Sequence, residues 1–209
     1  MDKSKIYVIA EIGNNHQGDV KHALKLMKEA KNAGADAVKT QKRDNKTLYT
    51  KTFFNQVYDN PNSFGLSYGE HREKLELKKS DYQELIDYSK EIDIDFFATP
   101  FDLSSLDFLE QFDLKSYKIA SADITNTILQ TEISKTGKEI FLSTGGGSLE
   151  DVKRAKENIF QHNKNLSILQ CTASYPARLE DMNLRVITTY AKTFPGLRFE
   201  YTDDNSFNC

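Results

Sequence analysis

The sequence predicts an α/β fold, specifically an incomplete (β/α)8 barrel of the TIM type. Seven short runs of β-branched and other apolar residues alternate with longer amphipathic stretches, which is typical of parallel strands joined by helices. The sequence has no GxGxxG after its first predicted strand and no GxxxxGKS or GxxxxGKT anywhere, so it lacks the marks of nucleotide-binding doubly wound folds. Polar residues also gather where the predicted strands end, and barrels carry their functional groups there.

The strands are expected where short apolar runs stand between helical stretches. In chain order, they cover residues 6–12, 37–41, 95–100, 116–121, 139–144, 166–171 and 197–202. Most of these runs are apolar at consecutive positions, which indicates strands that are covered on both faces.

Six helices are expected to connect these strands. The first ends at Gly34 and has an apolar face formed by Val20, Ala23, Leu24, Met27 and Ala30. A long irregular segment then runs to about residue 79, and the next helix begins at Ser80 with Gln83 at capping-box spacing. The third carries Leu103, Leu106, Leu109 and Phe112, and the fourth is short and ends near Gly137. The last two have apolar or capping positions at Ser148, Asp151, Val152, Ala155 and Ile159, and at Leu184, Ile187, Ala191 and Phe194 before Pro195.

These counts favour a single barrel domain over residues 1–209 that lacks its last helix–strand–helix. An eight-unit barrel needs roughly 250 residues, and this chain has 209. The first and seventh strands would then expose their pairing edges, and apolar faces meant for the missing helices would be uncovered. We therefore expect poor solubility or oligomerisation.

Composition excludes several classes of protein. The net charge is −3, with 28 Lys and Arg against 31 Asp and Glu, so no basic field favours a nucleic acid partner. The two cysteines, Cys171 and Cys209, give neither a disulfide framework nor a zinc spacing, which fits a reducing cytoplasm. The apolar run near the N-terminus breaks at Glu11 and Gly13, so we expect neither a signal peptide nor a membrane span.

The residues at the strand ends suit an anionic ligand. Lys39 and Lys118 lie on separate strands beside small hydroxyls and glycines, a combination that binds groups such as phosphate. Nearby carboxylates could move a proton or orient substrate hydroxyls. The structural alternative is an ion pair between Lys39 and Glu11, because a bare buried ammonium is costly. Gly145–Gly147 could likewise be only the turn that enters a helix.

The histidines and one tyrosine leave alternatives open. His16 lies in the loop after the first strand and could face the site, whereas His22 and His162 are expected to face solvent. His71 either covers the site as part of a lid or caps a helix. Tyr175 either forms a rigid turn with the following proline or contacts the substrate.

Several motifs in this order and spacing resemble the sialic acid synthase family. They are IAEIGNNHQGD, GADAVKTQ, YGEHRE, FFATPFD, YKIASADITN, LSTGG, LQCTASYP and EDMNLRVI, and the resemblance covers residues 5 to about 203. It implies a (β/α)8 barrel followed by a small antifreeze-like domain, which is absent here, and a domain-swapped homodimer. It also implies condensation of phosphoenolpyruvate with an N-acetylmannosamine-type sugar, which forms a nonulosonic acid and releases phosphate. A divalent metal, manganese or magnesium, is implied as well.

The resemblance also implies roles for individual residues. The set that binds phosphoenolpyruvate is expected to be Lys39, Thr99, Lys118, Ser121 and Ser143. The groups expected to hold the sugar or assist proton transfer are Glu11, Gln41, Asp123 and Tyr175, with Glu11, Asp123 and Tyr175 as the catalytic candidates. The metal would polarise the aldehyde oxygen of the sugar.

The chain departs from the family after the seventh predicted strand. The family usually reads Tyr-Ser-Asp-His there, and this chain reads Tyr201-Thr202-Asp203-Asp204. Thr202 keeps a hydroxyl for substrate binding. Asp204 replaces a metal-binding histidine, and its carboxylate can still bind manganese or magnesium. The second metal histidine would lie on the missing eighth strand.

Three functions are therefore in competition. The first is a sialic acid synthase-type enzyme. The second is a catalytically inactive, truncated remnant that binds phosphoenolpyruvate or a partner subunit. The third, another metal-dependent aldolase-like barrel, ranks last because the sequence shows no clear histidine cluster. N-acetylmannosamine, its 6-phosphate and bacterial di-amino sugars all fit the motifs.

Overall fold

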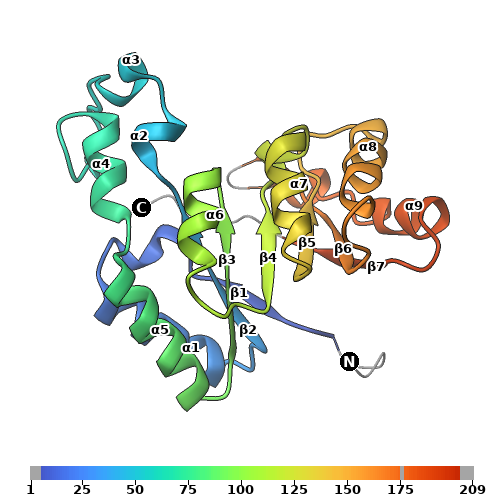
Figure 1. Cartoon of the computed structure of the whole chain (residues 1–209), viewed down its shortest axis with the longest axis horizontal. Helices are drawn as coiled ribbons and strands as arrows, with labels where there is room; N and C mark the ends of the chain where they lie inside the picture. Colours follow the sequence, from blue (N-terminus) through green and yellow to red (C-terminus); the bar gives the residue numbers. More distant parts are fainter. Residues whose placement is uncertain (1–5, 175–176, 203–209) are drawn as a thin grey trace.

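A computed structural model describes residues 6–174 and 177–202, and in it seven parallel strands form one sheet in sequence order (Figure 1). The strands are β1 Ile9–Glu11, β2 Ala37–Lys42, β3 Asp95–Pro100, β4 Ser116–Ile119, β5 Glu139–Ser143, β6 Leu166–Gln170 and β7 Arg198–Tyr201. This order, with helices between neighbouring strands, confirms the predicted incomplete barrel.

The first strand is shorter than the predicted residues 6–12. Its first register partner is Ala37, opposite Ile9, so the residues before Ile9 have no strand beside them. Ile6 is accordingly 82% exposed. The Val8 carbonyl accepts from the backbone amides of Asp36 at 2.8 Å and Ala37 at 3.1 Å, and the Val8 amide donates to Asp36 Oδ2 at 2.9 Å.

The six predicted helices are present and cover the convex face of the sheet. They are α1 Val20–Asn32, α5 Lys79–Glu91, α6 Leu103–Leu109, α7 Thr127–Lys135, α8 Leu149–Phe160 and α9 Val186–Thr193. Asp19 caps α1 by accepting from the backbone amides of Lys21 and His22. Ser148 and Asp151 form the predicted capping box of α8.

The predicted start of α5 was wrong by one residue, and its cap was misassigned. The helix begins at Lys79, and the Asp81 side chain accepts from the Lys78 amide at 2.9 Å. Ser80 and Gln83 therefore lie inside the helix, where Gln83 donates to Asp87 at 3.0 Å.

The segment after β2 was predicted as irregular, but it holds three further helices, α2 Asn45–Leu48, α3 Lys51–Phe54 and α4 Tyr68–Leu75. The described part of the chain thus has nine α-helices rather than six, with three short 3-10 turns, η1 Gly13–His16, η2 Ser121–Asp123 and η3 Leu179–Asp181. Ser67 and Glu70 form a capping box at the start of α4. The Tyr68 ring packs against Tyr49, Phe53 and Tyr58 at centroid distances of 4.8–5.4 Å, so aromatic contacts order the segment.

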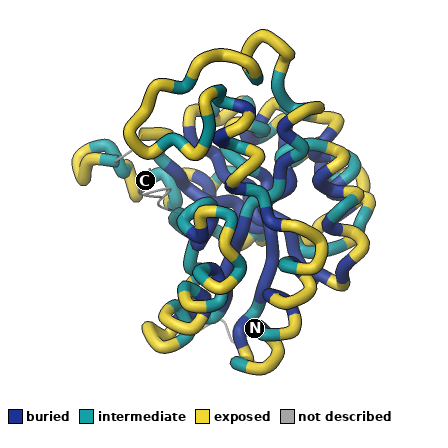
Figure 2. The backbone as a smooth tube through the Cα atoms, turned by 90° about the vertical axis from the view of Figure 1, so that its left-hand side faces the viewer, coloured by how far each residue is buried: buried dark blue, intermediate teal, exposed yellow. Residues whose placement is uncertain are grey.

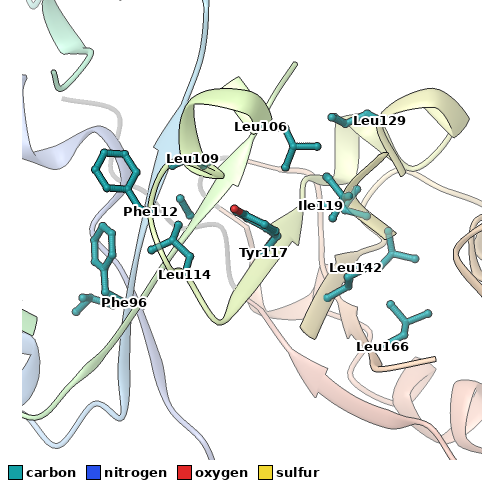
Figure 3. Close-up of a cluster of buried hydrophobic side chains, with 14 of the residues drawn as sticks. Phe96, Leu106, Leu109, Phe112, Leu114, Tyr117, Ile119, Leu129, Leu142 and Leu166 are labelled. Atoms are coloured by element: carbon teal, nitrogen blue, oxygen red, sulfur yellow. The ribbon is translucent and has the colours of Figure 1, made fainter. Parts of the chain in front are cut away.

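The main core lies between the sheet and the outer helices, and buried positions follow the strands (Figure 2). Figure 3 shows part of it, with Phe96, Leu106, Leu109, Phe112, Leu114, Tyr117, Ile119, Leu129, Leu142 and Leu166. Burial of each such side chain contributes about 1.5–3 kcal/mol. A smaller cluster on the opposite, concave face consists of Ala37, Phe97, Phe141 and Leu169.

The concave face is open between the first and last strands. A cavity of about 1120 Å³ is lined by residues of β1 and β7 together with Phe97, Phe141 and Leu169. Among the described residues, β1 pairs only with β2 and β7 only with β6, so each keeps one unpaired edge. No helix in the described ranges is long and apolar enough to span a membrane.

We predict that the 209-residue chain self-associates through this open side. Its light-scattering mass should exceed 23.9 kDa and rise with concentration. Ile6→Lys combined with Val8→Lys places charge beside the β1 edge and should reduce association. Leu66→Lys, at a residue 86% exposed before α4, is the matched control and should change nothing. A monodisperse monomer that melts cooperatively would contradict this prediction.

Candidate active site

Alternation along the strands builds the site in layers on the concave face. Residues two apart point the same way in a strand, so Lys39 lies above Ala37 on β2 and Thr99 above Phe97 on β3. The apolar residues form the floor towards the amino ends of the strands. The polar residues stand at the carboxyl ends, where the sequence predicted a site.

A buried triad of charges occupies the polar layer. The Glu11 carboxylate on β1 binds Lys39 Nζ on β2 at 2.8 Å and Lys118 Nζ on β4 at 2.7 Å. Lys39 Nζ also donates to Thr99 Oγ1 at 2.9 Å. The predicted structural pair of Lys39 with Glu11 is therefore present, and a second lysine shares the same carboxylate. Two ammonium groups thus converge on one carboxylate.

The triad holds Glu11 ionised. Burial would raise the pKa of Glu11, but the ion pairs with Lys39 and Lys118 outweigh it and lower the pKa to about 2. Both lysines are almost fully buried, with 1% and 4% exposed. Removal of the carboxylate would leave two buried ammonium groups short of a partner, which is unfavourable.

A pocket of about 500 Å³ opens above the triad. It is lined by five of the predicted residues, namely Lys39, Gln41, Thr99, Lys118 and Ser121. This volume lies within the range of small-molecule sites, about 300–1,000 Å³. The structure therefore brings most of the predicted anion-binding set together around one space.

Two predicted serines lie at the carboxyl ends of β4 and β5, and of these Ser121 lines the pocket whereas Ser143 is not part of its lining. Ser121 Oγ accepts from the Gly145 amide at 3.0 Å, which leaves its own proton to donate. A Cβ at position 145 would lie 3.0 Å from Ser121 Oγ, so this close approach favours glycine. Ser143 is fully buried at the end of β5, and its Oγ has no hydrogen-bond partner among the described residues. The turn at Gly145–Gly147 thus both enters α8 and positions a serine.

The remaining predicted residues stand apart from the pocket lining. Asp123 in η2 accepts from Asn126 Nδ2 at 3.0 Å, and burial raises its pKa. Thr202 follows β7, lines the open cavity and donates its amide to Gln170 at 2.9 Å. Tyr175 and Asp204 lie outside the described residues. Their roles stay predictions.

The histidines differ in their surroundings. His16 is buried, its Nδ1 accepts from the Gly18 amide at 3.1 Å, and it does not line the pocket. Burial, together with the charge of His22, lowers the pKa of His16 to about 4. His71 lies within α4, lines the pocket and stacks on Phe64 with centroids 5.7 Å apart. It belongs to the pocket wall, which favours the covering role over that of a helix cap.

Several residues that line the pocket were not among the predicted site residues. They include Arg43 and Arg72, with Asn14, Tyr58, Phe64 and Phe101. One signal could have found Arg43, because positions 39, 41 and 43 continue the two-residue alternation of β2. Arg72 lies within the motif YGEHRE, but the motif did not single out this arginine because its helix was not predicted.

Metal ligands do not gather in the described part of the chain. Among residues 6–174 and 177–202, no group of three or more His, Cys, Asp or Glu could hold a metal ion. Asp204, the predicted ligand, lies outside these ranges.

Comparison with known proteins identifies close relatives. The sequence profile of the NeuB family matches residues 26–206. N-acetylneuraminate-9-phosphate synthase of Mus musculus is 36% identical over 96% of this chain and 56% of its own length. N,N'-diacetyllegionaminic acid synthase of Campylobacter jejuni is 35% identical over 91% of the chain and 58% of its own. The chain thus spans little more than half the length of these relatives.

A solved structure has the same fold. The N-acetylneuraminic acid synthetase of Leptospira borgpetersenii, crystallised in complex with citrate, superimposes with a TM-score of 0.82. It is 30% identical in sequence, and the match covers 95% of this chain and 65% of that one.

We predict that Glu11→Gln lowers the free energy of unfolding by about 3 kcal/mol, because it breaks a buried ionic network. Urea denaturation measures the change. Glu132→Gln removes the carboxylate from the exposed pair with Lys135 and should cost less than about 0.5 kcal/mol. Equal small effects in the two variants would show that the triad contributes little.

The same variant gives a pH test. A carboxylate with a lowered pKa in the folded state stabilises the protein above its unfolded pKa, and this contribution is lost as pH falls through the folded pKa. The stability difference between the unmodified chain and Glu11→Gln should therefore narrow between pH 4.5 and about pH 2. A difference that stays constant over this window in urea titrations would contradict the lowered pKa.

Proposed function

The chain belongs to the NeuB family, and on that premise we propose that its pocket binds phosphoenolpyruvate and condenses it with an amino sugar to form a nonulosonic acid. One observation carries the proposal. The triad of Glu11, Lys39 and Lys118 places two lysine ammonium groups at the bottom of a pocket that the Ser121 side chain also lines. Phosphoenolpyruvate carries a carboxylate and a phosphate, and the lysine ammonium groups at the bottom of the pocket attract both.

The lysines and serines hold the enol substrate. Lys39 and Lys118 supply point charges, and the Ser121 hydroxyl donates a hydrogen bond to the same anion. Glu11 stays ionised at neutral pH, so it positions the two ammonium groups rather than donating a proton. Ser143, whose buried Oγ has no partner among the described residues, is a further donor for a bound ligand.

The reaction forms one carbon–carbon bond and releases one phosphate. C3 of phosphoenolpyruvate attacks the aldehyde carbon of the open-chain sugar, and the aldehyde oxygen takes up a proton. Water adds at C2, and its oxygen becomes the ketone oxygen of the product. The bond between C2 and the phosphate-bearing oxygen breaks, and phosphate leaves with that oxygen. Of the two protons of the water, one balances the proton taken up by the aldehyde oxygen and the other leaves with the phosphate. Asp123 keeps its proposed part in proton transfer on the family resemblance, and burial raises the pKa of its carboxyl.

Three further assignments stay part of the proposal. Gln41 lines the pocket next to the triad and can hydrogen-bond the sugar. Tyr175 and Asp204 keep their proposed roles in substrate and metal binding, on the family resemblance alone. A divalent metal, manganese or magnesium, would polarise the aldehyde when bound.

The first test measures phosphate release. Purified chain should release phosphate from phosphoenolpyruvate only when N-acetylmannosamine and manganese are both present. Lys39→Ala should abolish phosphate release, because it removes one of the two lysine ammonium groups at the bottom of the pocket. Lys164→Ala, at an exposed position, is the matched control and should keep full activity.

Calorimetry distinguishes the proposed synthase from the alternative, a catalytically inactive remnant. Binding of phosphoenolpyruvate that Lys39→Ala abolishes, without phosphate release, would favour a remnant that binds but does not turn over. The absence of both phosphoenolpyruvate binding and phosphate release would overturn the proposal.

A further inference from the structure

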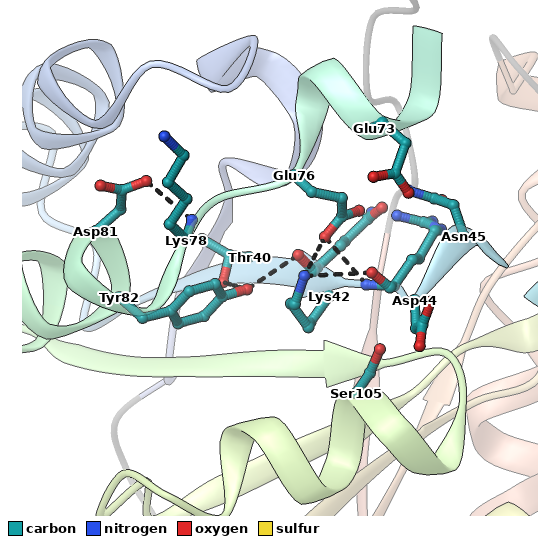
Figure 4. A network of polar contacts seen from close by, with 12 residues as sticks. Thr40, Lys42, Asp44, Asn45, Glu73, Glu76, Lys78, Asp81, Tyr82 and Ser105 are labelled. Carbon is teal, nitrogen blue, oxygen red and sulfur yellow. Dashed lines mark hydrogen bonds and ion pairs between the residues drawn. The ribbon is translucent and has the colours of Figure 1, made fainter. Parts of the chain in front are cut away.

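The carboxyl end of β2 is held from the convex side of the sheet, opposite the pocket. Gln41 on this strand lines the pocket, and Tyr82 belongs to α5 on the other side. The Tyr82 hydroxyl donates to the Gln41 carbonyl oxygen at 3.0 Å and accepts from Thr40 Oγ1 at 3.5 Å (Figure 4). A side chain of the main core thus contacts the backbone of a residue in the pocket wall.

The first strand ends before it can pair with this carbonyl. Carbonyls two residues apart along a strand face the same side, and the Lys39 carbonyl oxygen accepts from the Ile12 amide at 3.0 Å on the β1 side. The Gln41 carbonyl therefore faces β1 as well. The last register pair between the two strands joins Glu11 to Lys39, and the chain then turns into η1. The Tyr82 hydroxyl supplies the donor that a longer first strand would have given.

The hydroxyl is the part of Tyr82 that core packing does not need. The residue is fully buried, and its ring packs against Phe96, Phe108 and Phe112 with centroids 5.3–6.2 Å apart. A phenylalanine ring would make the same contacts. Burial raises the pKa of Tyr82, so the hydroxyl keeps its proton and stays a donor at neutral pH.

Glu76 holds the next peptide group along the same strand end. Its Oε2 accepts from the Arg43 backbone amide at 3.2 Å and from Lys42 Nζ at 2.8 Å (Figure 4). On the other side, the Phe101 amide donates to the Lys42 carbonyl oxygen at 3.1 Å. Two consecutive peptide groups at the end of β2 are therefore fixed by side chains that come from outside the sheet.

The place of the Gln41 side chain depends on this backbone. A Cβ at Gly13 would lie 3.0 Å from Gln41 Nε2, so η1 leaves the amide little room to shift. Among the described residues, the pocket lining includes Gln41 but neither Tyr82 nor Glu76. Any effect of these two residues on a ligand must therefore pass through the end of β2.

We propose that Tyr82 and Glu76 are positioning residues, which fix the carboxyl end of β2 so that the Gln41 side chain meets the acceptor sugar. The inference rests on the proposed function, in which Gln41 hydrogen-bonds that sugar. Both residues act before the sugar binds, because a side chain that is already in place loses little freedom on binding. Positioned groups also tolerate displacements of only about 1 Å.

Calorimetry tests the positioning role. Tyr82→Phe removes only the hydroxyl and should weaken the binding of N-acetylmannosamine by about tenfold, because Gln41 is no longer held in one place. Phosphoenolpyruvate affinity should stay within about twofold, since the contacts of Glu11 with Lys39 and Lys118 are intact.

Tyr117→Phe is the matched control. Tyr117 on β4 is also fully buried, and its hydroxyl donates to Glu110. Neither of these residues is part of the described pocket lining. This variant also loses one tyrosine hydrogen bond, so it should lower the melting temperature to a similar extent and leave both affinities unchanged.

Two substitutions of Glu76 test the other contact. Glu76→Ala should weaken sugar binding as Tyr82→Phe does, because the Arg43 amide loses its acceptor. Glu76→Gln keeps an oxygen that can accept from this amide and should retain most of the affinity. Equal losses in the two variants would show that the charge of Glu76 matters rather than its hold on the strand, and would overturn its positioning role.

Hydrogen–deuterium exchange examines the strand end without any ligand. The Phe101 amide, which bonds to the end of β2, should exchange about tenfold faster in Tyr82→Phe than in the unmodified chain. Its exchange rate in Tyr117→Phe should stay unchanged.

The outcomes separate this proposal from the proposed function. Unchanged sugar affinity and unchanged exchange in folded Tyr82→Phe overturn the positioning role alone. Equal losses of sugar affinity in Tyr82→Phe and Tyr117→Phe overturn it too, because they would reflect general destabilisation. A lack of phosphoenolpyruvate binding in the unmodified chain overturns the proposed function, and the exchange rate of Phe101 then decides whether Tyr82 holds the strand end. Far-ultraviolet circular dichroism and melting temperatures ensure that only folded variants are compared.

Discussion

The concave face depends on one carboxylate shared by two lysines. Glu11 lies on the first strand, Lys39 on the second and Lys118 on the fourth, so their contact requires the sheet to curl. An isolated lysine inside a strand would oppose folding, and the shared carboxylate offsets that cost. Because both lysines also line the pocket, the arrangement that permits their burial places two ammonium groups where an anion can contact them.

The segment from α2 to α4 forms part of the pocket wall at this end of the barrel. It brings Tyr58, Phe64 and Arg72 over the strand ends and so converts an open rim into a pocket. The segment packs against the first loop so closely that a Cβ at Gly18 would lie 2.0 Å from the Lys74 carbonyl oxygen. Gly18 also has a φ of +75°, which favours glycine for a second reason. The loop and the segment are therefore held together by backbone contact.

The pocket contains polar groups that the protein alone does not satisfy. Arg43 and Arg72 retain buried nitrogens without partners in the described part of the chain, although most buried polar groups in folded proteins are hydrogen-bonded. Such exceptions reduce stability, and they are expected where a ligand completes the hydrogen bonding. The stable core lies elsewhere, between the convex face of the sheet and its helices.

The sequence by itself determined the strand order, six of the helices and the end of the sheet that carries Lys39, Thr99, Lys118 and Ser121. These features follow from local periodicity, because two-residue alternation and helical spacing are written in neighbouring residues. The helices after β2 escaped prediction because aromatic contacts between residues far apart in the segment order them. Only the tertiary structure decided that Glu11 binds both lysines and that Arg43 shares a pocket with Arg72. Both depend on how the sheet curls and how α4 packs, and no local pattern of residues encodes either.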